Sequence, residues 1–200
     1  MDCDVWLVPL VDVLCHNPEN PFRDELAAYD ATLGGNGLPP VPVHAWSSGT
    51  GEVRLAGAFD HESLHHLRRA YLLHRTGFPV TPVERLGGDY DRLLETFEAA
   101  AQHSHLVWHY DHAGAYVPVD FSRPLMDDPL PEAGGPLGSS LGMLRELEDL
   151  APCIGIDLLE PPRPTPTYDG ADFARERFVW ATLYAAAYDS VTQGAMVVFA

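Results

Sequence analysis

Hydrophobic and polar positions along this chain form short runs that predict both strands and helices. Residues 5–14 are almost continuously apolar, which predicts a buried strand. Residues 52–58 alternate between polar and apolar and predict a second strand, and residues 196–199 form a short buried strand near the end. Helical spacing with capping residues predicts helices over 21–33, 60–75, 89–102, 139–151 and 171–193.

The segments 104–110 and 115–121 together predict a β-hairpin. If residues 111–114 form a tight turn, apolar side chains of the two segments face one another on one side of the pair. On the opposite side His109 faces Tyr116, and His105 faces Asp120. Agreement of both faces in one register favours the hairpin.

The order of these elements predicts the class of fold. Strands and helices do not alternate strictly, so we expect a single α+β domain over residues 1–200, with several helices packed on a mixed sheet of about five short strands. Two loops interrupt the pattern. Residues 122–137 are acidic and rich in Pro and Gly, and residues 161–166 are Pro-rich and predicted to be extended.

Charge restricts the possible partners. The chain has 29 acidic and 12 basic residues, and its net charge is −17. No basic stripe is present, so we expect no nucleic acid and no anionic membrane as partner. The field favours a basic protein, for which Asp127, Asp128 and Glu132 in the acidic loop are the candidate contacts. The alternative is that acidity only keeps the protein soluble.

Residue usage removes further classes of protein. All basic residues are Arg, which excludes a Schiff-base lysine and a P-loop lysine. Three scattered cysteines do not form a disulfide framework or a cysteine-based zinc site. The acidic start of the chain lacks the basic region of a signal peptide, and no apolar run is long enough for a membrane span, so a cytoplasmic location is predicted.

His61, Glu62 and His65 match the H-E-x-x-H motif of zinc peptidases. Two histidines one helical turn apart can hold zinc while the glutamate activates water. Arg68 and Arg69 lie in the same sector of the predicted helix, and their positive charge opposes a metal. We therefore favour a charged, solvated helix face over a zinc site here.

Residues 138–142 match G-x-S-x-G, the pattern of a nucleophile elbow. That elbow needs a strand directly before the serine and a histidine later in the chain. The preceding residues are rich in Pro and Gly and cannot form a central strand, and no histidine follows His112. Capping of the next helix by Ser139 or Ser140 explains the motif better.

The polar face of the predicted hairpin is the strongest candidate for chemistry. Histidines at alternate positions of a strand can share a metal ion, and a carboxylate opposite them can complete the site. The same groups also suit general acid–base chemistry, or they are simply tolerated on a hydrated sheet face. The candidate ligands for zinc or another divalent metal are His103, His105, His109, Asp111 and Asp120.

Two hypotheses about function follow. In the favoured one, the chain is a small acidic protein without catalytic activity that binds another macromolecule, as an inhibitor, immunity-type protein or adaptor. In the alternative, it binds a divalent metal through the His/Asp face, with or without hydrolytic activity.

Overall fold

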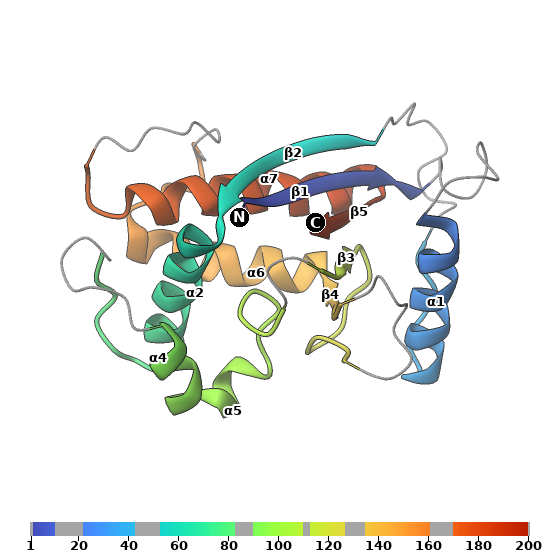
Figure 1. Ribbon diagram of the computed structural model, residues 1–200, viewed down its shortest axis with the longest axis horizontal. Coiled ribbons are helices and arrows are strands. Elements are labelled where there is room, and N and C mark those ends of the chain that lie inside the picture. The colour runs from blue at the N-terminus through green and yellow to red at the C-terminus, as the bar shows by residue number, and fades with distance from the viewer. Residues whose placement is uncertain are drawn as a thin grey trace.

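The computed structural model describes residues 2–10, 22–42, 53–82, 90–109, 113–126, 135–160 and 170–199. A mixed sheet of five strands, in the order β2-β1-β5-β3-β4, organises this part of the chain (Figure 1). The strands are β1 (Asp2–Pro9), β2 (Arg54–Asp60), β3 (Ala115–Val117), β4 (Leu137–Ser139) and β5 (Ala195–Phe199). Neighbours are antiparallel except β3 and β4, which run parallel. The predicted α+β class with a mixed sheet is confirmed.

Helices cover both faces of this sheet. They are α1 (Phe22–Gly35), α2 (His61–Arg75), α4 (Tyr90–Thr96), α5 (Glu98–Ala101), α6 (Ser140–Leu150) and α7 (Ala174–Gln193), and the 3-10 turn η3 (Ala151–Ile154) follows α6 directly. One hydrophobic core joins a sheet face to α2, α6 and α7, and a second joins the other face to α1. No helix among the described residues is both long and apolar enough to cross a bilayer.

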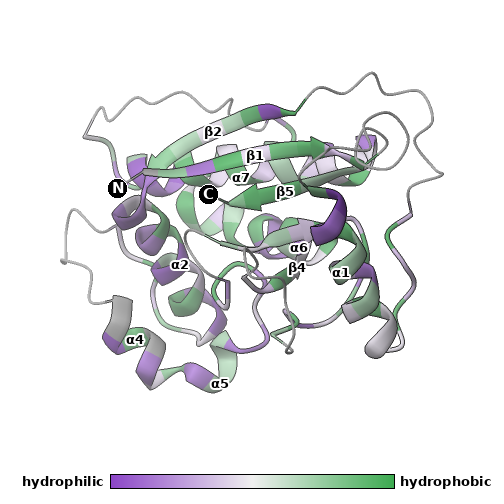
Figure 2. Ribbon diagram, turned by 45° about the vertical axis from the view of Figure 1, so that its right-hand side comes forward, coloured by the Kyte–Doolittle hydropathy of each residue, from purple (hydrophilic) through white to green (hydrophobic). Residues whose placement is uncertain are grey.

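Strand β5 contributes to both cores because its side chains alternate between the two faces of the sheet. Ala195, Val197 and Phe199 belong to the core with α2, α6 and α7, whereas Met196 and Val198 belong to the core with α1. All five residues are buried. Figure 2 shows the resulting hydrophobic centre at β5, with hydrophilic stretches on α4 and α5 at the periphery.

Local signals in the sequence place several helix ends correctly. The Asp60 carboxylate accepts a hydrogen bond from the Ser63 amide and caps α2, as predicted. The Ser139 hydroxyl accepts from the Gly142 amide and caps α6. Helix α7 ends at Gly194, which has a left-handed φ of 68°.

The predicted hairpin over 104–110 and 115–121 is wrong. Residues 104–109 form turns, and the strand of the second segment, β3, is only three residues long. The neighbours of β3 are β5 and β4. Strand β4 was missed because the residues before it are rich in Pro and Gly, which are poor strand formers.

Gly57 marks a close approach of β2 to α7 and yields a test of the packing. A Cβ atom added at Gly57 would lie 2.6 Å from Cγ2 of Thr182. We expect Gly57→Ala to lower the free energy of unfolding by about 1–3 kcal/mol, because the β-branched Thr182 has little rotamer freedom on a helix. Denaturant titration measures this change.

Two further variants distinguish a steric clash from a general effect of alanine. A Cβ atom added at Gly34 in α1 would have no atom within 4 Å, so Gly34→Ala should leave stability unchanged or raise it slightly. Thr182→Ser removes Cγ2 and should recover most of the loss in the Gly57→Ala background. If the double variant is as unstable as Gly57→Ala alone, the close contact is not the cause.

Candidate functional site

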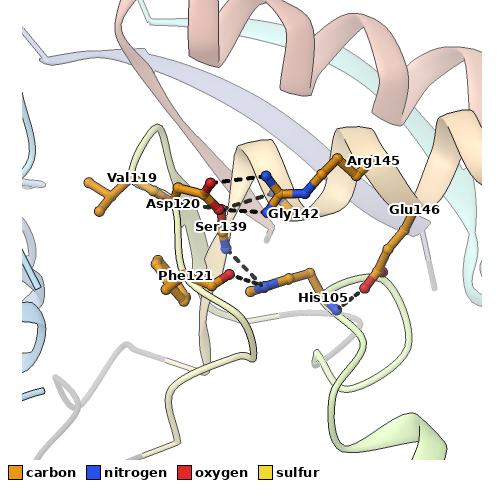
Figure 3. Close-up of polar contacts among 8 residues, drawn as sticks. All are labelled: His105, Val119, Asp120, Phe121, Ser139, Gly142, Arg145 and Glu146. Carbon is orange, nitrogen blue, oxygen red and sulfur yellow. Dashed lines mark hydrogen bonds and ion pairs between the residues drawn. The ribbon is translucent and has the colours of Figure 1, made fainter.

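The segment that carries the predicted histidine face is held by Glu146 of α6. The Glu146 carboxylate accepts hydrogen bonds from the Ser104 hydroxyl (2.9 Å) and from the amides of His105 (2.9 Å) and Leu106 (2.7 Å). The Ser104 hydroxyl in turn accepts from the Val107 amide. This arrangement satisfies the amides of a turn much as a side chain caps a helix N-terminus. Figure 3 shows the contact of Glu146 with His105.

The alternation of polar and apolar residues over 103–109 therefore does not reflect a strand with one hydrated face. His105, Leu106, Val107 and His109 are all buried, although they would point to opposite sides of a strand. Glu146, 40 residues further along the chain from Leu106, supplies the hydrogen bonds that a neighbouring strand would have supplied. The sequence pattern alone gave no signal of this distant partner.

His105 uses both ring nitrogens inside the protein. Nε2 donates to the Phe121 carbonyl oxygen at 2.9 Å, and Nδ1 accepts from the Ser139 amide at 3.1 Å (Figure 3). Burial lowers the pKa of the imidazole to about 4, so the ring is neutral at pH 7 with its proton on Nε2. The lone pair on Nδ1 is the only one with which this ring could bind a metal, and the metal would have to displace the Ser139 amide from it.

The other members of the predicted metal site make separate contacts. The His109 ring stacks on Tyr116 with centroids 4.2 Å apart, whereas His103 is exposed. Asp120, expected opposite His105, instead forms a two-pronged ion pair with Arg145, which lowers the pKa of its carboxyl. Asp111 lies outside the described residues.

No group of three or more His, Cys, Asp or Glu side chains in the described ranges is arranged to hold a metal. The structure thus removes the hairpin on which the metal hypothesis was built, and metal binding by these histidines stays a prediction.

The H-E-x-x-H residues lie at the start of α2, as expected. The helix face that they share with Arg68 and Arg69 is not fully solvated. Most residues of α2 are buried, including Arg68 and Arg69. The Arg68 guanidinium donates to the carbonyl oxygens of Leu106 and His109 at 2.8 Å each. Glu62 is exposed and lies 3.6 Å from Arg175, and His61 and His65 are partly exposed.

Packing and capping account for the G-x-S-x-G residues. Strand β4 does precede α6, but it is a three-residue strand at the edge of the sheet. A Cβ atom on Gly138 would lie 2.3 Å from the Tyr116 ring, and one on Gly142 would lie 2.2 Å from the His105 ring. The Ser140 hydroxyl is buried against that of Ser190 at 2.6 Å, so it does not face a substrate.

Positive and negative side chains are distributed differently in the described residues. Several guanidinium groups are directed inward to backbone oxygens or paired with carboxylates; these belong to Arg54, Arg68, Arg69, Arg145, Arg175 and Arg177. Exposed carboxylates, by contrast, line α4–α5 and the segment from α6 to the residues after η3; they belong to Glu95, Glu98, Glu148, Asp149, Asp157 and Glu160. Among the described residues, exposed carboxylates outnumber exposed guanidinium groups, so this part of the surface carries net negative charge.

A cleft of about 410 Å³ opens beside this acidic segment. Tyr71, His105, Arg145, Glu146 and Asp149 are among its lining residues. Burial raises the pKa of Glu146 to about 7, although the hydrogen bonds from two amides and Ser104 oppose that shift. The predicted contact residues of the acidic loop, Asp127, Asp128 and Glu132, lie outside the described residues.

Comparison with known proteins identifies a family for this chain. A family model described as "Putative DNA-mimic protein" matches residues 1–199. No curated protein and no solved structure matches the chain.

This match corrects the expectation about partners. The sequence analysis excluded nucleic acid and pointed to a basic protein in general, because an acidic chain cannot hold a phosphate backbone. The family description overturns the exclusion of nucleic-acid recognition, since the matching family is described as one of DNA mimics, whereas the basic protein partner stays a prediction. That exclusion considered only the repulsion between an acidic chain and a phosphate backbone, and this repulsion does not limit which proteins the chain binds.

His105 and Glu146 should give stability opposite dependences on pH. The lowered pKa of His105 means that its stabilising effect is present above pH 6.5 and is lost as pH falls towards 4. The raised pKa of Glu146 means that stability is greatest below 4.5 and is lost as pH rises through about 7.

Between pH 7 and pH 5, we expect acidification to destabilise Glu146→Gln more steeply than the wild type, and His105→Gln less steeply. The difference in slope for one full proton is about 1.4 kcal/mol per pH unit, which sets an upper limit. Urea titrations at several pH values measure it. Difference curves that stay flat for both variants would contradict the assignment of these protonation states.

Proposed function

The chain belongs to the DNA-mimic family described above, and we propose that it binds a DNA-binding protein on the surface that otherwise holds duplex DNA. The match over residues 1–199 carries this proposal. A protein-interaction role of this kind needs no active site. It is the favoured hypothesis of the sequence analysis with the partner made specific, and the protein acts as an inhibitor by competition.

The distribution of charge supports this role. Double-stranded DNA carries about one negative charge per 1.7 Å of helix axis, and proteins that bind it present Lys and Arg to that array. This chain has a net charge of −17 and no Lys. Exposed carboxylates outnumber exposed guanidinium groups among the described residues, although Arg23, Arg54, Arg75, Arg92, Arg123 and Arg145 are exposed as well.

A competition experiment tests the proposal directly. The purified protein is immobilised and incubated with nuclease-treated extract of its source cells, and retained proteins are eluted with a duplex oligonucleotide. We expect the eluted proteins to bind DNA, and free protein to displace a labelled duplex from them in a gel-shift assay. Poly-glutamate of equal charge should elute them less well, because charge alone does not reproduce the arrangement of the carboxylates. Retained proteins that duplex DNA does not displace would contradict competition.

Neutralising exposed carboxylates should weaken this binding. The triple variant Glu148→Gln, Asp157→Asn and Glu160→Gln removes three negative charges from residues 148–160, at the end of α6 and after it. We expect a higher Kd for the captured partner and a shallower dependence of log Kd on log salt, because fewer of the partner's cations are neutralised.

A charge-balanced pair of substitutions is the matched control. Asp120→Asn with Arg145→Gln removes an exposed ion pair and leaves the net charge unchanged, so it should alter neither Kd nor its salt dependence. Equal weakening by both variants would show that charge is not the cause.

A further inference from the structure

Cys153, His74 and Asp149 form a hydrogen-bonded series. The Cys153 sulfur lies 3.3 Å from His74 Nδ1, and His74 Nε2 lies 3.0 Å from an Asp149 carboxylate oxygen. The His74 side chain is 28% exposed and that of Asp149 is 49% exposed, and Cys153 is partly buried. The group is therefore open to small molecules from solvent.

Three features of the fold bring these residues together. His74 lies in the last turn of α2, and Asp149 lies in the last turn of α6. The η3 turn then places Cys153 four residues after Asp149, and Gly155, with a left-handed φ of 71°, ends that turn. The residues come from segments 79 positions apart, so no local motif in the sequence indicates the group.

The geometry fixes the roles of the two ring nitrogens. The Asp149 carboxylate can only accept, so Nε2 carries the ring proton and Nδ1 presents its lone pair to the thiol. The thiol and the carboxylate contact nitrogens on different sides of the ring, so the three do not converge on one ion. In agreement, no metal-binding group of this kind occurs in the described ranges.

We infer that Cys153 is a reactive thiol that exchanges with low-molecular-weight disulfides, with His74 as its base and Asp149 as the positioning residue. This inference does not depend on the proposed function. It rests on the arrangement of thiol, imidazole and carboxylate that activates cysteine nucleophiles in general.

The reaction conserves atoms and electrons. The Cys153 proton passes to His74 Nδ1, and the thiolate attacks one sulfur of the disulfide. A new S–S bond forms to Cys153 while the original S–S bond breaks, and the leaving thiolate takes the proton from His74. The leaving sulfur is reduced to a thiol, and the attacked sulfur stays bonded to Cys153 in a mixed disulfide. The Cys153 sulfur is oxidised.

Cys3 provides an internal comparison. It lies in β1, fully buried in the core that joins the sheet to α2, α6 and α7. A reagent cannot reach it in the folded protein, so it should remain unmodified under native conditions. Cys15 lies outside the described residues, and a Cys15→Ser background removes its contribution.

The test uses 4,4′-dithiodipyridine, a neutral disulfide that the acidic surface does not repel. The release of 4-thiopyridone at pH 7 gives the rate, and peptide mapping by mass spectrometry gives the modified cysteine. We expect Cys153 to react first, and His74→Gln to slow its reaction by at least about tenfold. Asp149→Asn should slow it less, and Asp149→Glu should recover part of the loss.

Three controls separate chemistry from unfolding. His103→Gln changes an exposed histidine on another segment and should leave the rate unchanged. Thermal unfolding of each variant shows whether it is folded. Added imidazole should accelerate the reaction of Cys153 in His74→Gly, a rescue that a purely structural role of His74 would not give. If folded His74→Gln reacts as fast as the wild type, or imidazole has no effect on a folded His74→Gly, the inference is overturned.

Discussion

The antiparallel pairing of β1 with β5 is the contact on which the rest of the fold depends. These strands come from the two ends of the described chain, yet they lie side by side, with Val5 opposite Phe199. Because β5 is buried on both faces, both hydrophobic cores require it. The last residues of the chain must therefore join the sheet before either core is complete, and local helix formation alone cannot stabilise the fold.

Several polar side chains that suggest chemistry instead replace missing backbone partners. Glu146 caps the turn at residues 104–107, Arg68 binds two carbonyl oxygens of the same region, and His105 connects Phe121 to Ser139. Each satisfies backbone groups that no strand or helix satisfies. This explains why His105 and Ser139 are buried, since burying an unpaired backbone group costs more than burying a hydrogen-bonded side chain.

The same internal use of polar groups shapes the surface. Arg68 and Arg69 bind backbone oxygens inside the protein, so their positive charges do not lie among the exposed acidic residues. The proposed DNA-binding partner would contact these exposed acidic residues. The Cys153–His74–Asp149 group lies at the edge of this acidic segment, because Asp149 belongs to it.

The sequence by itself determined the features that depend on neighbouring residues. Capping by Asp60 and Ser139, the end of α7 at Gly194, the buried strand at residues 195–199 and the excess of acidic charge all follow from local residue types. Tertiary structure alone decided that residues 104–109 form a turn, because Glu146 binds their amides from another helix. It also decided that His74 meets Cys153. The periodicity of side chains indicates which residues are buried, but it does not indicate which distant residue supplies a hydrogen bond. At residues 104–109 that distant hydrogen-bond partner decides whether the backbone forms a strand or a turn.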